Sequence, residues 1–222
     1  MEILLYFGAI IIMMVAQAGV QNKYRKYSQV KADCGLTGAE VARRILDNKG
    51  LYDVSVELNT SGGVLSDHYD PRANVVRLSR DVYSRTSIAS VAIAAHEVGH
   101  AIQHAEKYGA ITLRNKILPY AIVAQNLGWG AIFIGFLSGY ETFVGIGILL
   151  LFVIVSFQLV TLPVELNASS RALTLLSDGF LYEDEVGDAK SMLSAAAFTY
   201  IAALISTVVN ILRIILMNRR RD

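Results

Sequence analysis

The residues of this chain that could do chemistry together begin with two histidines four positions apart, His96 and His100. Glu97 directly follows the first of them, so the run reads H-E-x-x-H. On a helix, residues at i and i+4 share one face, and both imidazoles can then bind one tetrahedral Zn²⁺. Glu97 lies outside the coordination positions and can act as the general base toward a metal-activated water. A chance match is the alternative, but these polar groups on an apolar helix are costly unless a metal or hydrogen bonds satisfy them.

A catalytic zinc site needs a third protein ligand and one open position, and Glu165 is the best candidate for that ligand. It follows Pro163, which is well placed at the first turn of a new helix. The competing interpretation is a helix-start carboxylate that the helix dipole favours. Ser169, one turn after Glu165, shares its face and could hydrogen-bond a ligand histidine, and Asn167 is a second candidate for such a supporting contact.

Other histidines and tyrosines offer weaker signals. His104 continues the histidine row by another four residues, but two helical turns span about 12 Å, too far for a single ion. We therefore expect His104 to be a surface or supporting residue. His68 and Tyr69 lie on a predicted hairpin and could line the cleft or donate to a developing oxyanion, although a strand end before a turn also needs polar residues. The single cysteine, Cys34, cannot form an internal disulfide.

Composition shows which kind of protein must position these residues. Of the 222 residues 54% are hydrophobic and only 18% are charged, which is too apolar for an ordinary soluble domain of this size. The net charge of +1 gives no basic field that would attract nucleic acid. No glycine fingerprint for phosphate binding is present, so a nucleotide partner has no support. The lipid bilayer is the expected surrounding.

The apolar runs predict a mainly α membrane protein. It would have about four transmembrane helices plus a small α+β zincin-like metallopeptidase domain with a short antiparallel sheet. The first run could instead be a signal peptide, since 16–18 mimic a cleavage site, but its start lacks the basic region of such peptides. The expected segments are transmembrane helix 1 at 3–20, the extramembrane domain at 21–117, a transmembrane hairpin of helices 2 and 3 at 118–162, the third-ligand helix and a polar connection at 163–192, and transmembrane helix 4 at 193–218.

Local signals place the elements of the extramembrane domain. Thr37 followed by Glu40 has the spacing of a capping box, and Ser87 is a plausible N-cap for the helix that carries the histidines. Turn residues separate three short runs of strand-forming residues. The expected elements are a helix at 38–49, strands at 54–58, 64–69 and 75–78, and a helix at 88–106.

Basic residues on both sides of the membrane give conflicting orientation signals. Lys23, Arg25 and Lys26 follow the first span, whereas 219–221 are three arginines that follow the last span. Because the first helix usually dominates insertion, we expect the polar domain in the cytoplasm.

Several segments taken together resemble the YugP-like neutral zinc metallopeptidases, a family of small bacterial membrane proteins. The segments are 66–71, 94–103, 162–169 and 197–200, and the resemblance covers nearly the whole chain. It implies one Zn²⁺ held by His96, His100 and Glu165, with Glu97 as the catalytic residue. There is a looser likeness to the HtpX-type and prenyl-protein membrane peptidases, which place an aspartate four residues after the glutamate ligand. Here that position is Ser169, so supporting contacts and substrate preference do not carry over from those peptidases.

The leading hypothesis is a zinc-dependent endopeptidase of the bacterial cell membrane. It would hydrolyse peptide bonds of membrane or membrane-proximal polypeptides with a metal-activated water. The alternative is a non-catalytic zinc-binding membrane scaffold or chaperone, against which the presence of Glu97 argues. Metal-dependent lipid or oxygen chemistry generally needs more than the four histidines present.

Overall fold

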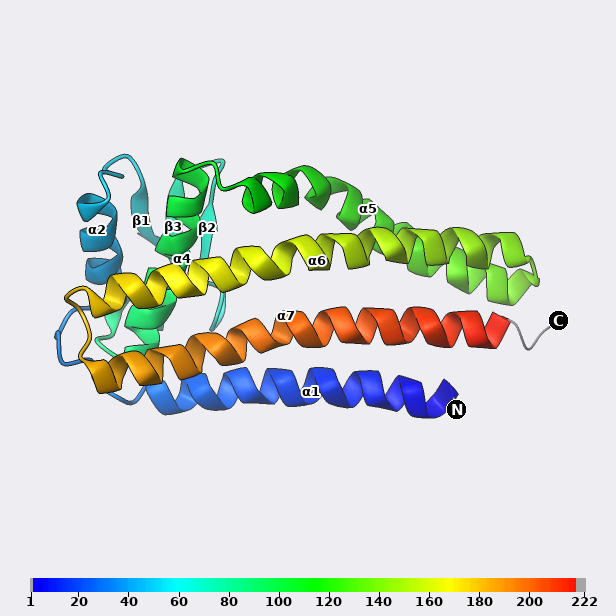
Figure 1. Cartoon of the computed structure of the whole chain (residues 1–222), viewed down its shortest axis with the longest axis horizontal. Coiled ribbons are helices and arrows are strands. Elements are labelled where there is room, and N and C mark those ends of the chain that lie inside the picture. Colours follow the sequence, from blue (N-terminus) through cyan, green and yellow to red (C-terminus); the bar gives the residue numbers. More distant parts are fainter. Residues whose placement is uncertain (1, 219–222) are drawn as a thin grey trace. The chain divides into compact units, whose positions relative to one another are not determined.

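The computed structural model describes residues 2–218, most of which are helical (Figure 1). Four of the helices described there are long and apolar enough to cross a membrane, and the strands form one three-stranded sheet. The predicted fold class is thereby confirmed. In chain order the elements are α1 (Glu2–Tyr27), α2 (Gly38–Asn48), β1 (Ser55–Leu58), β2 (His68–Asp70), β3 (Val75–Leu78), α3 (Arg80–Ser84), α4 (Ile88–Ala105), α5 (Gly109–Ser138), α6 (Glu141–Ser177) and α7 (Glu183–Asn218).

The chain folds as two compact units. Of the described residues, the first unit contains 2–18, 109–163 and 198–218, which are the most apolar parts of α1, α5, α6 and α7. We call it the membrane unit. The second, which we call the polar unit, contains 19–108 and 164–197, including α2, α3, α4 and the sheet.

Small residues let α5 and α6 approach closely within the membrane unit. A Cβ added to Gly147 would lie 2.8 Å from the carbonyl oxygen of Gly128, and one added to Gly135 would lie 2.8 Å from the backbone nitrogen of Val144. The turn between the two helices contains Gly139 at φ +77°, a conformation that favours glycine. Buried aliphatic side chains complete the core of this unit, among them Ile132, Leu151, Ile154 and Ile214.

The expectation that a new helix begins at Pro163 is wrong. Helix α6 continues through Pro163 to Ser177. Proline removes one backbone donor, but the residues beyond it keep a buried apolar face, since Val164, Ala168 and Ala172 are all 0% exposed. The packing of that face stabilises the continued helix by more than the lost hydrogen bond costs.

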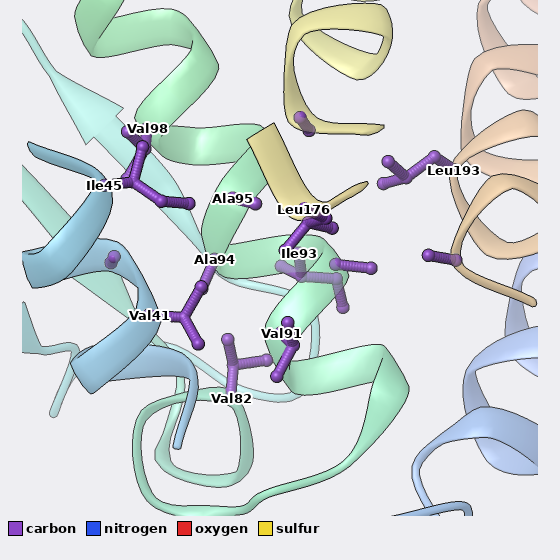
Figure 2. Close-up of a cluster of buried hydrophobic side chains, with 14 of the residues drawn as sticks. Val41, Ile45, Val82, Val91, Ile93, Ala94, Ala95, Val98, Leu176 and Leu193 are labelled. Atoms are coloured by element: carbon purple, nitrogen blue, oxygen red, sulfur yellow. The ribbon is translucent and has the colours of Figure 1, made fainter. Parts of the chain in front are cut away.

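Local signals place α2 and α4 correctly, whereas the short helix α3 was not among the expected elements. Thr37 and Glu40 form the predicted capping box at the start of α2, and Ser87 accepts a hydrogen bond from the Ser90 backbone at the start of α4. Helix α4 is buried almost all round. Figure 2 shows its side chains Val91, Ala94 and Val98 packed among residues of α2, α3, α6 and α7, such as Ile45, Val82, Leu176 and Leu193.

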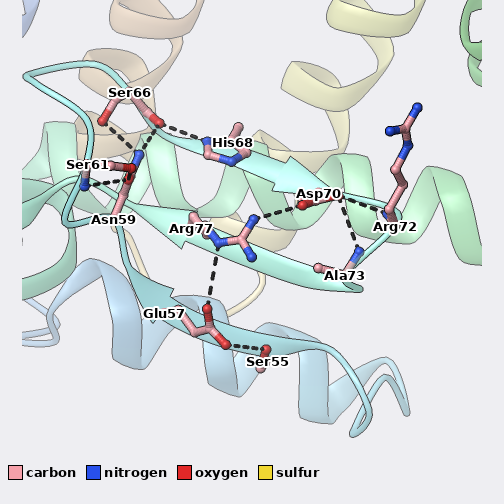
Figure 3. Close-up of polar contacts among 10 residues, drawn as sticks. All are labelled: Ser55, Glu57, Asn59, Ser61, Ser66, His68, Asp70, Arg72, Ala73 and Arg77. Carbon is pink, nitrogen blue, oxygen red and sulfur yellow. Dashed lines mark hydrogen bonds and ion pairs between the residues drawn. The ribbon is translucent and has the colours of Figure 1, made fainter.

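The sheet is mixed rather than antiparallel. Strands β2 and β3 form the predicted antiparallel hairpin, but β1 pairs with β3 in parallel, so the order is β1-β3-β2. The loop after β1 explains this pairing. Asn59 donates to the backbone and side chain of Ser66 and closes that loop, which leads into β2 on the far side of β3 (Figure 3). Asp70 accepts from the backbone of Arg72 and Ala73 in the hairpin turn, as its position there predicts.

Candidate metal centre

Helix α4 places His96 and His100 on one face, as the four-residue spacing predicts. Their ring centroids are 4.8 Å apart, and both side chains are largely buried. Glu165 of α6 points its carboxylate at the same place. Its Oε2 atom lies 3.3 Å from Nε2 of His96 and 3.6 Å from Nε2 of His100.

The donor set and its spacing fit zinc. Two imidazole nitrogens and one carboxylate oxygen lie within 4.8 Å of one another, an arrangement that could hold a metal ion. A tetrahedral Zn²⁺ with ligands at about 2.0–2.2 Å would hold neighbouring ligand atoms about 3.3–3.6 Å apart. Both nitrogen-to-oxygen separations already have these values, so the carboxylate lies at zinc spacing from each imidazole nitrogen.

Gly99 allows α6 to reach this position. A Cβ on this residue would lie 2.8 Å from the carbonyl oxygen of Ala168, closer than real Cβ contacts. The second variable position of H-E-x-x-H is therefore a point of direct backbone contact between α4 and α6. Without that contact, Glu165 could not approach the histidines so closely.

Gln103 fixes the protonation of His100. Its side-chain nitrogen donates to the carbonyl oxygen of Val164 at 2.8 Å and to the side-chain oxygen of Asn167 at 2.9 Å. A backbone carbonyl can only accept, so the other end of the amide, Oε1, faces Nδ1 of His100 at 3.0 Å. Nδ1 must then carry a proton, so in the neutral imidazole Nε2 is the nitrogen available to a metal ion. Sequence reasoning missed Gln103, although its place three residues after His100 on the same helix was a usable signal.

Ser169 contacts His96 in the way that Gln103 contacts His100. The serine hydroxyl lies 3.1 Å from Nδ1 of His96, so Nε2 is again the nitrogen that faces Glu165. Asn167 does not touch either histidine through a described contact. It acts on the pair indirectly, by holding Gln103 and by accepting a 2.8 Å hydrogen bond from Arg171.

Glu97 is buried beside the hairpin. Its Oε2 accepts a 3.1 Å hydrogen bond from the backbone N–H of Tyr69 in β2. In the register of the hairpin Tyr69 lies opposite Val76, and its N–H points away from β3 to Glu97, as alternate N–H groups of an antiparallel strand do. Glu97 therefore lies at the outer edge of β2, the edge that pairs with no other strand of the sheet.

The remaining sequence candidates lie outside the three-ligand cluster. The hydroxyl of Tyr69 contacts Asn74 and, at 3.2 Å, Nδ1 of His104. His104 is exposed and is not a member of the cluster, as expected from its distance along the helix. His68 is also exposed, and its Nδ1 lies 2.9 Å from the carbonyl oxygen of Ser66 (Figure 3). A role for His68 in the cleft stays a prediction.

The pKa of Asp67 depends on its burial and on its neighbours Glu97 and Ser79. Burial raises the pKa of Asp67, and the negative charge of Glu97 adds to this effect, while hydrogen bonds from Ser79 oppose it. Asp67 is thus held in place as a partner of Ser79 at the start of α3. For His100, burial lowers the pKa, but contacts with Glu165 and the charge of Glu97 outweigh this and raise it above the ordinary value.

These features together define a membrane-bound zinc metallopeptidase of the His-His-Glu type. They are an H-E-x-x-H helix, a glutamate from a later helix and several helices long enough to cross a membrane. Comparison with known proteins supports this class of protein. The chain belongs to the family described as "Putative neutral zinc metallopeptidase", whose model matches residues 2–219. It is 47% identical over 216 residues to the "Putative membrane protease YugP" of Bacillus subtilis (strain 168), covering 97% of this chain and 95% of that protein. No solved structure matches the chain.

Proposed function

We propose that the chain is a zinc-dependent endopeptidase that cleaves membrane or membrane-proximal polypeptides. One Zn²⁺ would be held by His96, His100 and Glu165, with Glu97 as the general base. The observation that carries the proposal is the convergence of these three ligand atoms within 4.8 Å of one another, with a buried carboxylate next to the first histidine. Family membership supports zinc as the metal and a peptide bond as the target.

The residues of the chain have separate tasks in this reaction. Zinc, when bound, would polarise the scissile carbonyl and make a water molecule acidic enough to lose its proton near neutral pH. The Tyr69 N–H holds Oε2 of Glu97, which leaves Oε1 to accept the proton from the water. Glu97 would then return this proton to the leaving amine. Gln103 keeps His100 in its metal-binding tautomer, and Ser169 holds the His96 ring in place through Nδ1.

The outer edge of β2, which pairs with no other strand of the sheet, supports a polypeptide as substrate. An extended chain can add to an exposed strand edge through main-chain hydrogen bonds. Glu97 lies at that edge, so a polypeptide bound there would lie beside the general base. We place this reaction on the cytoplasmic side of a bacterial membrane, because Lys23, Arg25 and Lys26 lie in the last turns of the first candidate span, beyond its apolar part.

The test is the zinc content of detergent-purified protein, measured together with cleavage of a soluble unfolded protein. We expect about one zinc per wild-type chain. Glu165→Ala should lose both zinc and cleavage, whereas Glu97→Gln should keep zinc and lose cleavage. His104→Ala is the matched control, because it removes an exposed histidine of the same helix outside the cluster, and it should change neither quantity.

Two results would contradict the proposal. If Glu165→Ala retains full zinc affinity, the third ligand lies elsewhere. If Glu97→Gln cleaves as fast as wild type, Glu97 is not the base. The scaffold or chaperone alternative predicts that wild type binds zinc and cleaves no polypeptide at all.

A further inference from the structure

The membrane unit contains a cavity of about 220 Å³ whose lining shares no residue with the metal centre. Side chains from α1, α5, α6 and α7 line it, and they include no charged residue. Five of them are nevertheless polar, which is unusual inside helices as apolar as these: Gln125, Gln158, Ser206, Thr207 and Asn210. Polar groups at membrane depth are costly and commonly mark functional positions.

One of these polar groups lacks a partner. Thr207 donates its only hydroxyl proton to the carbonyl oxygen of Ala203 at 2.9 Å. It must therefore accept the 3.0 Å hydrogen bond from the side-chain nitrogen of Gln158. This fixes the orientation of the Gln158 amide and leaves its Oε1 buried without a hydrogen-bond partner among residues 2–218. Gln158 is also a lining residue of the cavity, so this unsatisfied acceptor belongs to the cavity wall.

The chemistry of the cavity indicates a neutral ligand that both donates and accepts hydrogen bonds. Gln125 and Asn210 add two further amides to the lining, and no described hydrogen bond occupies either of their side chains within 2–218. A phosphate or other anionic headgroup would call for arginine or lysine, which the lining lacks. A peptide group offers one donor and one acceptor and no charge, which matches this set of side chains.

The volume of the cavity and its opening to the surface also fit a peptide group as the ligand. At about 30 Å³ for each water molecule, 220 Å³ corresponds to roughly seven waters, the space of one or two residues. Trp129 and Met13 border the cavity and are 44% and 36% exposed, so it opens on the surface of the membrane unit. A segment lying in the bilayer could reach it from the side.

We propose that this cavity binds the backbone of a transmembrane segment of the substrate, at a point where a glycine or proline interrupts its helix. An interrupted helix exposes peptide N–H and C=O groups that lipid cannot satisfy. The Gln158 oxygen accepts one such N–H, and the amides of Gln125 and Asn210 pair with the neighbouring groups. The inference rests on the proposed function and names its substrate class more narrowly.

The experiment compares two substrates of the full-length, zinc-loaded protein in lipid nanodiscs. One is a soluble unfolded protein. The other is a reporter tethered by a transmembrane segment with a central Gly-Pro pair and a cleavable stretch beside the membrane. For Gln158→Leu combined with Thr207→Val, we expect the ratio of kcat/KM for the tethered over the soluble substrate to fall about tenfold, equivalent to about 1.4 kcal/mol. Gln17→Leu removes an exposed amide outside the cavity lining and should leave the ratio unchanged.

A ratio that stays at the wild-type value in the double variant would overturn the inference, as would an equal loss on both substrates. If wild type cleaves neither substrate, the proposed function fails instead. A second measurement does not depend on turnover: a photo-crosslinking amino acid replaces Trp129 in the Glu97→Gln protein. Crosslinks to the tethered segment, reduced when its Gly-Pro pair is changed to Leu-Leu, support the inference. Crosslinks to lipid alone contradict it.

Discussion

At the scale of single residues, Gln103 is the side chain that connects the two halves of the metal centre. It is fully buried and bonds His100 on its own helix as well as Val164 and Asn167, which follow it by 61 and 64 residues. The contacts continue from Asn167 to Arg171, which forms an ion pair with Glu106 at the end of α4. One amide thus orients a ligand and ties α4 to the helix that carries the third ligand.

We therefore expect Gln103→Leu to weaken zinc binding by about 10- to 100-fold, the usual effect of losing the partner of a ligand histidine. The reason is that leucine has a similar size but cannot hold Nδ1 of His100 in its protonated form. Competition with a chromogenic chelator measures the affinity. Gln17→Leu is the control for the same chemical change at an exposed site. An unchanged zinc affinity in folded Gln103→Leu protein would remove Gln103 from the metal centre.

At the scale of elements, the crossing of α4 and α6 depends on Gly99. An alanine in a helix is normally more stable than a glycine by about 1 kcal/mol. At this crossing the added methyl group would meet the Ala168 carbonyl at 2.8 Å, and overpacking of this kind costs about 1–3 kcal/mol. The steric cost exceeds the gain in helix propensity, and relief by movement of α6 would draw Glu165 away from the histidines.

Gly99→Ala should consequently lower both thermal stability and zinc affinity. Gly187→Ala is the matched control, because Gly187 lies in α7 and an added Cβ would meet nothing within 4 Å. There the same substitution should leave zinc binding unchanged and stabilise the protein by up to about 1 kcal/mol. Thermal unfolding of the detergent-purified proteins, followed by circular dichroism, measures the first quantity, and the chelator competition measures the second. Equal behaviour of the two alanine variants would show that the α4–α6 contact is not tight in solution.

At the scale of the whole molecule, zinc should stabilise the folded state because its ligands come from two helices far apart in sequence. A ligand that binds only the folded form adds about 2.7 kcal/mol when its free concentration is 100 times its Kd. Removal of the metal with a chelator should therefore lower the apparent Tm of wild type and of Glu97→Gln. Glu165→Ala should show no such decrease. If chelation leaves the wild-type Tm unchanged, zinc does not link α4 and α6.

The sequence by itself determined the local features of this protein. The histidine spacing, the Thr37 capping box and the long apolar runs each depend on residues a few positions apart, so their periodicity and chemistry can be interpreted directly. Glu165 could be proposed as a ligand because an acid next to an apolar run is rare. Its supporting proline was misinterpreted, since a start signal in the sequence proved to lie inside a continuous helix.

Only the tertiary structure decided how these pieces meet. Four features had no local signal: the parallel pairing of β1 with β3, the passage of α6 through Pro163, the Gly99–Ala168 contact and the hydrogen bond from Gln103 to Val164. Each is a contact or an extension stabilised by residues distant along the chain. Their free energy comes from burial and from hydrogen bonds that exist only once the polar unit has folded. For that reason the sequence indicated which residues could bind zinc, while packing brought their side chains together.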